Sequence, residues 1–173
     1  MDNEERRKNI LSILKTTQHS VTGTALAEKF GVSRQIIVGD IALLRAKDIP
    51  IISTPRGYSL QKAGNAGITE SFLCCHKEDL MEAELLAIVD NGGCVHNVIV
   101  EHEVYGFLEG QLNLRSRRDV AMYMKQMQDN RAPLLSSISN GIHSHLVEAH
   151  SQEEMDAIRN ALEKLGVLYH PEK

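Results

Sequence analysis

Cysteine is scarce in this sequence, and long apolar runs are missing. The three cysteines, Cys74, Cys75 and Cys94, form neither a CxxC pair nor an even set, which argues against a disulfide framework or a zinc knuckle. No stretch approaches the roughly 18 apolar residues that a membrane span requires, and no apolar segment follows the charged start MDNEERRKNI. We therefore expect a cytoplasmic protein without membrane contact, whose cysteines are reduced and serve as small core residues.

Charge is divided unevenly along the chain. Residues 1–62 carry ten Lys and Arg against six Asp and Glu, whereas the remaining residues carry nine against seventeen. Such asymmetry is typical of a DNA-binding module joined to an acidic regulatory module. The segment 63–69 is rich in glycine and small polar residues and separates two strongly patterned regions. We predict a DNA-binding domain at 1–62, a linker at 63–69 and a regulatory domain at 70–173.

The first region has the pattern of a winged helix-turn-helix. Apolar spacing predicts a helix over 4–15, and Thr22 can cap a short second helix that ends at Gly31. Ser33 can cap a third helix, and the segment 51–60 predicts two short strands around a Pro-Arg-Gly turn, which is the expected wing. The apolar face of the third helix carries Ile37, Ile41 and Leu44.

The outer face of the third helix predicts contacts with double-stranded operator DNA. The first turn of such a recognition helix reaches base edges in the major groove, where Arg and Gln can make bidentate contacts with guanine and adenine. Taken singly, Arg34 and Gln35 are better explained by a solvated helix start, but their combination with the turn and the hairpin favours DNA binding. Threonines of the second helix and an arginine of the wing suit the phosphate backbone or the minor groove. The predicted DNA-binding residues are Thr22, Thr24, Ser33, Arg34, Gln35, Val38 and Arg56.

The second region predicts an α+β fold. Its patterns follow the order β-α-β-β-α-β-α, which fits a sandwich with helices on one face of a sheet. Strands are expected at 71–75, 95–100, 108–114 and 143–149, and helices at 78–90, after Ser116 and after Ser151.

Histidines are concentrated in this second region, and their placement suggests a metal site. His143 and His145 lie two apart on an expected strand, so both imidazoles project from one face, although a solvated pair is equally compatible with this pattern. Glu84 lies at or near the apolar face of an expected helix, where an ionised carboxylate is costly without compensation; the alternative is a position at the solvent border. Together with His76, which ends the preceding strand, these residues offer an N3O ligand set that suits zinc, nickel or iron.

Several segments resemble known families. The stretch GTALAEKFGVSRQIIVGDIALLRAKDIPIISTPRGYSL is similar to the winged-helix module of many bacterial repressors, from which Gly39 departs because a glycine offers no side chain to DNA. The segments CHKEDL, VHNVIVEHEVYG, RRDV and SNGIHSHLVE resemble the 3H domain. The whole chain resembles the NiaR-type niacin-responsive repressors, which join the two modules.

This resemblance implies a fold and a ligand set. It implies an HPr-like sensor domain, a divalent metal held by His76, Glu84, His143 and His145, and nicotinic acid as co-repressor. It further implies repression of genes for NAD synthesis or niacin uptake by a homodimer, which the two-fold symmetry of operators also favours.

Other roles and functions stay open. His96, His102 and Tyr105 are candidates for lining a ligand pocket, although His96 and His102 would share a strand face with Val98 and Val100, where ordinary packing competes. We expect a regulator and not an enzyme. The alternatives are a regulator that senses metal alone and a metal-dependent hydrolase fused to a winged helix.

Overall fold

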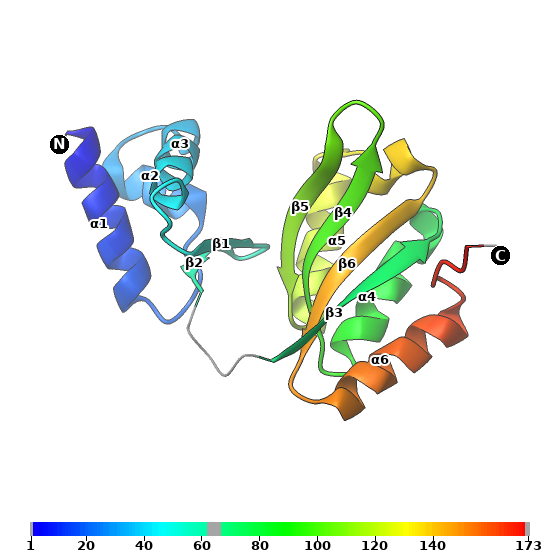
Figure 1. Cartoon of the computed structure of the whole chain (residues 1–173). Coiled ribbons are helices and arrows are strands. Elements are labelled where there is room, and N and C mark those ends of the chain that lie inside the picture. The colour runs from blue at the N-terminus through cyan, green and yellow to red at the C-terminus, as the bar shows by residue number, and fades with distance from the viewer. Residues whose placement is uncertain (1, 62–66, 172–173) are drawn as a thin grey trace. The chain divides into compact units, whose positions relative to one another are not determined.

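The chain divides into two compact units, Met1–Gly64 and Asn65–Lys173, and we describe each by itself (Figure 1). The structure is a computed structural model that describes residues 2–61 and 67–171. Residues 63–66 of the expected linker lie outside the described residues, and the first strand of the second unit begins at Ile68. Within the described ranges, no helix is both long and apolar enough to cross a membrane.

The first unit is a winged helix-turn-helix, as predicted. Its helices begin after Asp2, Thr22 and Ser33, whose side chains accept a hydrogen bond from a backbone N–H of the first turn. The second helix ends at Gly31, whose left-handed conformation, with φ of 62°, turns the chain toward the third helix. The elements are α1 (Asn3–Thr16), α2 (Gly23–Phe30), α3 (Arg34–Arg45) and the antiparallel wing strands β1 (Ile51–Thr54) and β2 (Gly57–Leu60).

A buried ion pair holds α1 against α3 in this unit. The three predicted inner-face residues of α3 are all buried in one apolar core, but Asp40 is buried beside them. Its carboxylate accepts a hydrogen bond from Nε of Arg6 at 2.6 Å and one from Arg7 at 3.3 Å. A buried carboxylate persists when such partners compensate its charge. The sequence pattern did not predict this pair, because α1 and α3 are far apart in the chain.

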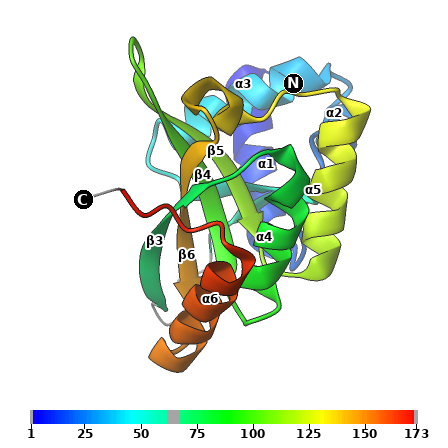
Figure 2. The same cartoon turned by 90° about the vertical axis from the view of Figure 1, so that its right-hand side faces the viewer.

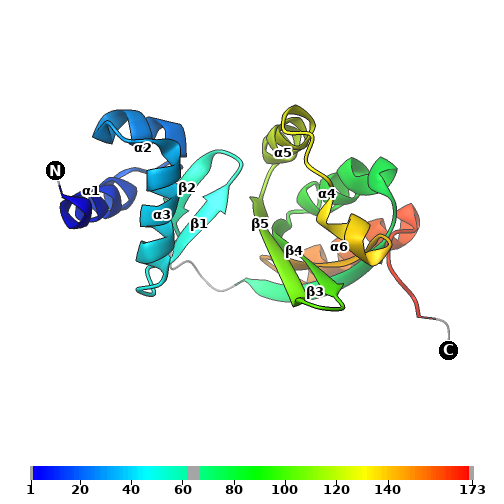
Figure 3. The same cartoon turned by 90° about the horizontal axis from the view of Figure 1, so that it is seen from above.

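The second unit is an α+β sandwich with the predicted order of elements. Its four strands form an antiparallel sheet in the order β3-β6-β4-β5, and the helices cover one face of it (Figures 2 and 3). The elements are β3 (Ile68–Cys75), η1 (Glu78–Leu80), α4 (Met81–Val89), β4 (Cys94–His102), β5 (Gly106–Leu114), α5 (Arg117–Asp129), η2 (Leu135–Ser139), β6 (Ile142–Ala149) and α6 (Gln152–Leu165).

The core of this unit lies between the sheet and its helices. Buried and partly exposed residues alternate strictly along β6, because successive side chains of a strand point to opposite faces. The buried residues of β6 include His143 and His145, which therefore lie on the face under the helices. This places two imidazoles in a layer that is otherwise made of apolar side chains such as Phe72, Leu85 and Ile158.

A bulge in β4 changes the expected position of His96. Val95 pairs with Val147 and Ile99 pairs with Ser144, so β4 has one residue more than β6 between these pairs. Val98 faces the helix side, whereas His96 hydrogen-bonds Glu148 on the other face. The expectation that His96 and Val98 share a face is wrong, because an extra residue breaks the alternation of the strand.

Candidate functional site

One buried carboxylate, that of Glu84, forms the centre of the site in the second unit. Glu84 lies in the first turn of α4, and its side chain is 1% exposed. The helix expected over 78–90 begins with the 3-10 turn η1, and α4 follows it from Met81. Leu80, which precedes α4, offers no side-chain cap. Glu84 therefore lies on the buried face of its helix and not at the solvent border. A charge at such a depth requires compensation.

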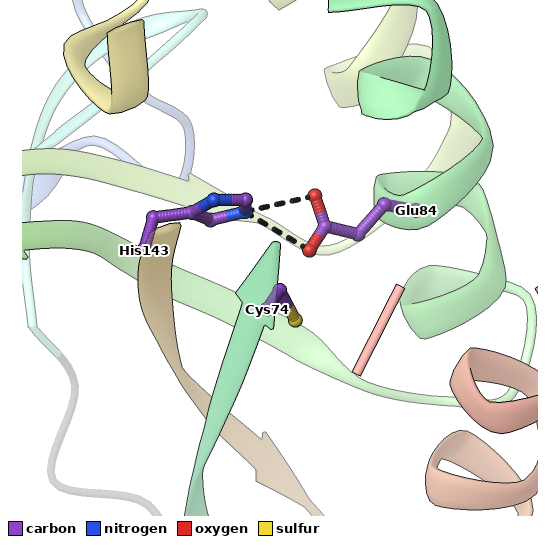
Figure 4. A group of neighbouring side chains, drawn as sticks. All are labelled: Cys74, Glu84 and His143. Carbon is purple, nitrogen blue, oxygen red and sulfur yellow. Dashed lines mark hydrogen bonds and ion pairs between the residues drawn. The ribbon is translucent and has the colours of Figure 1, made fainter. Parts of the chain in front are cut away.

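Three imidazoles surround this carboxylate. His143 and His145 come from β6, and His76 follows the end of β3. Nε2 of His143 lies 3.1 Å from Oε1 and 3.2 Å from Oε2 of Glu84, as the dashed lines in Figure 4 show. Nε2 of His145 lies 3.5 Å from Oε2, and Nε2 of His76 contacts the same oxygen. The structure thus brings together the four residues that the sequence predicted as metal ligands.

Gly141 allows the turn with His76 to approach β6. Its backbone has φ of 85°, and a Cβ atom at this position would lie 2.5 Å from the carbonyl oxygen of His76. The carbonyl oxygen of Gly141 accepts hydrogen bonds from the backbone N–H of His76 and from Nδ1 of His143. Gly141 thus holds His76 and His143 in place through its carbonyl oxygen, and any side chain at this position would push His76 away from β6.

The outer nitrogen of each imidazole is bound to a backbone carbonyl. Nδ1 of His76 donates to Lys77 at 2.6 Å, that of His143 to Gly141 at 2.8 Å, and that of His145 to Asn97 at 2.7 Å. Because a carbonyl oxygen only accepts, each Nδ1 carries a hydrogen, and the lone pair of the neutral ring lies on Nε2. All three lone pairs therefore face Glu84. Backbone partners of this kind orient the histidines of metal sites.

The charges of these groups are strongly coupled. Burial alone would raise the pKa of Glu84, but hydrogen bonds from His143, His145 and His76 outweigh burial and hold this pKa far below its usual range. Burial opposes the charged form of His76, yet its contact with Glu84 raises the pKa of this histidine. Neutral imidazoles and a carboxylate would all be acceptors facing one another. The site therefore needs protons or a metal ion between its groups.

This donor set fits a divalent transition metal. Three imidazole nitrogens and one carboxylate are the ligands that zinc, nickel and ferrous iron bind, and their backbone hydrogen bonds already fix the required tautomer. A bound ion would compensate the buried charge of Glu84 without protonation of the imidazoles. His76, Glu84, His143 and His145 are the residues that would hold it.

A small cavity lies next to these four residues. Its free volume is about 30 Å³, roughly the share of one water molecule in the liquid. Ligand pockets usually span about 300 Å³ or more, so an organic ligand would require the lining of this cavity to move. Among the described residues, no Lys or Arg lines this cavity. The remaining lining residues are Met81, Leu85, Val98, Leu112, Tyr123, Leu134, Leu135 and Ser136.

Two polar residues of this cavity were missed by the sequence pattern. Tyr123 lies on α5 and lines the cavity. The sequence pattern of α5 predicts that the helix has an apolar face, but it does not predict which part of the protein that face contacts. Ser136 lies in η2, a short 3-10 helix for which the pattern gives no signal. Tyr123 and Ser136 are the neutral polar groups that a ligand in this cavity would meet.

The three predicted pocket residues lie elsewhere. His96 bonds Glu148 at 2.7 Å on the outer face of the sheet. His102 lies at the end of β4, where its Nδ1 accepts hydrogen bonds from the backbone of Val104 and Tyr105. Tyr105 is 74% exposed at the hairpin between β4 and β5. None of the three lines the cavity beside Glu84, but His102 lines a separate, open hollow of about 570 Å³.

The predicted DNA-binding residues are all exposed on the first unit. Arg34, Gln35 and Val38 are exposed on the first turns of α3, and Val38 is 43% exposed. The hydroxyls of Thr22 and Ser33 cap α2 and α3 and can still donate their hydrogen to a phosphate. Thr24 on α2 and Arg56 in the wing turn are also exposed, so none of the seven residues is buried in the unit.

Replacing Arg34 by alanine should weaken binding to operator DNA by roughly 5- to 150-fold, the equivalent of about 1–3 kcal/mol for a bidentate contact with guanine. Fluorescence anisotropy with a labelled operator fragment, at one stated salt concentration, measures this change. Lys15→Ala, at the exposed end of α1, is the matched loss of positive charge. Equal losses in both variants would show that Arg34 contributes charge alone and reads no base.

A winged helix-turn-helix joined to a second unit with a buried histidine-carboxylate site defines a DNA-binding regulator with a second, α+β domain. Comparison with known proteins agrees with this class. Residues 6–59 match a family described as "HTH domain", and residues 69–171 match the "3H domain" family.

Two relatives match nearly the whole chain. The "Probable transcription repressor NiaR" of Thermotoga maritima is 39% identical over 165 residues, which cover 95% of this chain and 94% of the relative. The "Transcription repressor NadR" of Bacillus subtilis is 37% identical over 166 residues, which cover 94% of this chain and 92% of the relative. The chain belongs to the NiaR-type transcription repressors, as the resemblance predicted. It is a regulator and not an enzyme, so the hydrolase alternative is set aside.

Proposed function

We propose that this protein represses genes for NAD synthesis or niacin uptake, with nicotinic acid as co-repressor sensed at a metal-containing 3H domain. The observation that carries this proposal is the orientation of three imidazole Nε2 atoms toward the single carboxylate of Glu84. Their Nδ1 hydrogens are held by backbone carbonyls, so the lone pairs are arranged for an ion.

The cavity beside the site supports a role for the ion in ligand binding. A bound nickel, zinc or iron ion supplies a coordination position for the carboxylate or the pyridine nitrogen of nicotinate. Because no Lys or Arg of the described residues lines the cavity, the ion is the strongest partner for such a group. The apolar lining of Leu85, Leu112 and Leu134 suits a planar ring, while Tyr123 and Ser136 can donate a hydrogen bond to its other polar group.

A symmetric partner for the DNA-binding unit is part of this proposal. We propose a homodimer whose two winged helices reach successive major grooves, with ligand at the metal site favouring the spacing that binds DNA. Such a protein acts where the DNA is, in the cytoplasm. Sedimentation of the protein alone and with an operator fragment tests the dimer, and a monomer in both samples would refute it.

A second candidate function is sensing of the metal alone. The small free volume of the cavity favours it, since a site that accepts an ion needs no room for a ring. In this case the ion itself would shift the protein toward its DNA-binding state.

One experiment separates the two functions. The purified, metal-free chain is titrated with nickel, with nicotinate and with both, and operator affinity is measured at fixed salt. We expect nicotinate to raise the affinity severalfold or more in the presence of nickel and to have no effect without it. An affinity that rises with nickel alone and does not respond to nicotinate would establish the metal sensor and exclude the niacin response. Nicotinamide, which lacks the carboxylate, is the matched control ligand.

A further inference from the structure

A buried thiol lies beside Glu84 and His143, two residues of the proposed metal site. Cys74 is on the inner face of β3, opposite His143 in the register of β3 and β6, and is fully buried. Its Sγ, a ligand atom of Glu84 and a ligand atom of His143 all lie within 4.8 Å of one another. Figure 4 shows the thiol next to the carboxylate of Glu84. The sequence predicted only a small core residue at this position.

The other two cysteines have different surroundings. Cys75 lies on the opposite face of β3, where its Sγ is 4.0 Å from the carbonyl oxygen of Asn140. Cys94 is buried at the start of β4, where burial raises the pKa of its thiol to about 11. Across the described ranges, Cys74 is the one cysteine in a group of side chains close enough to share an ion. Cys75 and Cys94 can therefore serve as control cysteines in experiments on Cys74.

The thiol of Cys74 contacts a backbone carbonyl and the carboxylate of Glu84. Its thiol makes a long contact of 3.9 Å with the carbonyl oxygen of Phe72, which is a weak interaction for a weak donor. Burial, the nearby charge of Glu84 and a hydrogen bond with its carboxylate raise the pKa of this thiol. A positive ion beside Glu84 would reverse this balance, because a coordinating thiol loses its proton.

We propose that the sulfur of Cys74 is a fifth protein ligand of the ion at this site. The inference rests on the proposed metal site of His76, Glu84, His143 and His145. Metal bonds of about 2.3 Å to sulfur and about 2.1 Å to nitrogen or oxygen allow ligand atoms to lie up to roughly 4.4 Å apart. The ligand atoms of Cys74, Glu84 and His143 lie within 4.8 Å of one another, so a shift of a few tenths of an ångström would bring them onto one ion. When the bond to sulfur forms, the thiol proton passes to water and the ion releases one of its own water ligands.

A sulfur ligand has consequences for the choice of metal. Thiolate favours softer ions such as zinc, cobalt or nickel over magnesium, calcium or manganese, which prefer oxygen. Five protein donors also leave one position of a six-coordinate ion for a small ligand. The site would thus exclude the abundant hard cations and keep one position for an effector.

Cobalt(II) absorption tests this assignment on the full chain. Bound cobalt gives visible ligand-field bands whatever its ligands, and a sulfur ligand adds a near-ultraviolet charge-transfer band. We expect both signals in the unaltered protein and in Cys75→Ser. Cys74→Ser should keep the visible bands and lose the charge-transfer band, while His143→Ala should lose both. A variant with Cys75 and Cys94 both replaced by serine, which leaves Cys74 as its one cysteine, should keep both signals.

The outcomes distinguish this inference from the proposed metal site. Visible bands without a charge-transfer band in the unaltered protein would overturn the sulfur ligand and leave the four-residue site intact, as would a charge-transfer band that persists in Cys74→Ser. Absence of both signals from the unaltered protein would overturn the metal site and the sulfur ligand together. If Cys74→Ser does not fold, as judged by circular dichroism, the variant with Cys74 as its one cysteine decides the question.

Discussion

Replacing Glu84 by glutamine should abolish tight binding of nickel or zinc to this repressor, with a loss of affinity on the order of 100-fold or more. The loss of a partner that only orients a metal ligand already costs about 10- to 100-fold, and Glu84 would be a ligand itself. Isothermal titration calorimetry with nickel measures the change. Glu82→Gln, on the same turn of α4 but exposed to solvent, removes the same charge and should bind nickel normally.

The same substitution should destabilise the metal-free protein at neutral pH by about 3 kcal/mol or more, the usual cost of breaking a buried ion pair. The pKa of Glu84 is lowered in the folded state, so its stabilising effect is present above the ordinary glutamate value and is lost only in acid. Urea unfolding of the metal-free variants measures this loss. If Glu84→Gln bound nickel as Glu82→Gln does, the assignment of the metal ligands would be wrong.

Stabilisation of the protein by nickel should increase steeply with pH, by up to about 1.4 kcal/mol per pH unit for each proton that the ion displaces. The pKa of His76 is raised by Glu84, so the stabilisation from this protonated pair is present below the ordinary histidine value of about 6.5 and is lost as pH rises through the raised value. An ion replaces these protons and is not lost as pH rises. The stability of the metal-free protein should therefore fall above this pH range, whereas the stability of the nickel-bound protein should not.

Thermal unfolding at pH 6, 7 and 8, with nickel or with a chelator, checks this expectation. The difference in Tm between the two conditions should grow with pH in the unaltered protein and should be close to zero in Glu84→Gln at every pH. A difference that is constant or falls with pH would show that the ion does not compete with protons at these histidines.

Local sequence patterns predicted the elements well because each depends on neighbouring residues. Thr22 and Ser33 cap their helices through bonds to N–H groups three residues away, and Gly31 ends α2 through its own backbone conformation. The spacing of His143 and His145 likewise placed both imidazoles on one face of a strand, since alternation is a local property.

Predictions from the sequence failed where contacts join segments that are distant in the chain. The bulge in β4 depends on its pairing with β6 and moved His96 to the face away from Glu84. The partners of Asp40 are more than thirty residues away on α1, and no local pattern of α3 shows them. Strand pairing and helix packing select such contacts only once the whole unit has assembled.

The sequence by itself determined that this protein has a winged helix-turn-helix and an α+β domain rich in histidine, because periodicity, caps and turns are written in adjacent residues. It also predicted Glu84 and the three histidines around its carboxylate. Only the tertiary structure decided that their Nε2 atoms converge, that backbone carbonyls hold the opposite nitrogens, and that Cys74 lies beside them. These facts depend on strands and a helix far apart in the chain, whose packing sets distances that no local pattern contains.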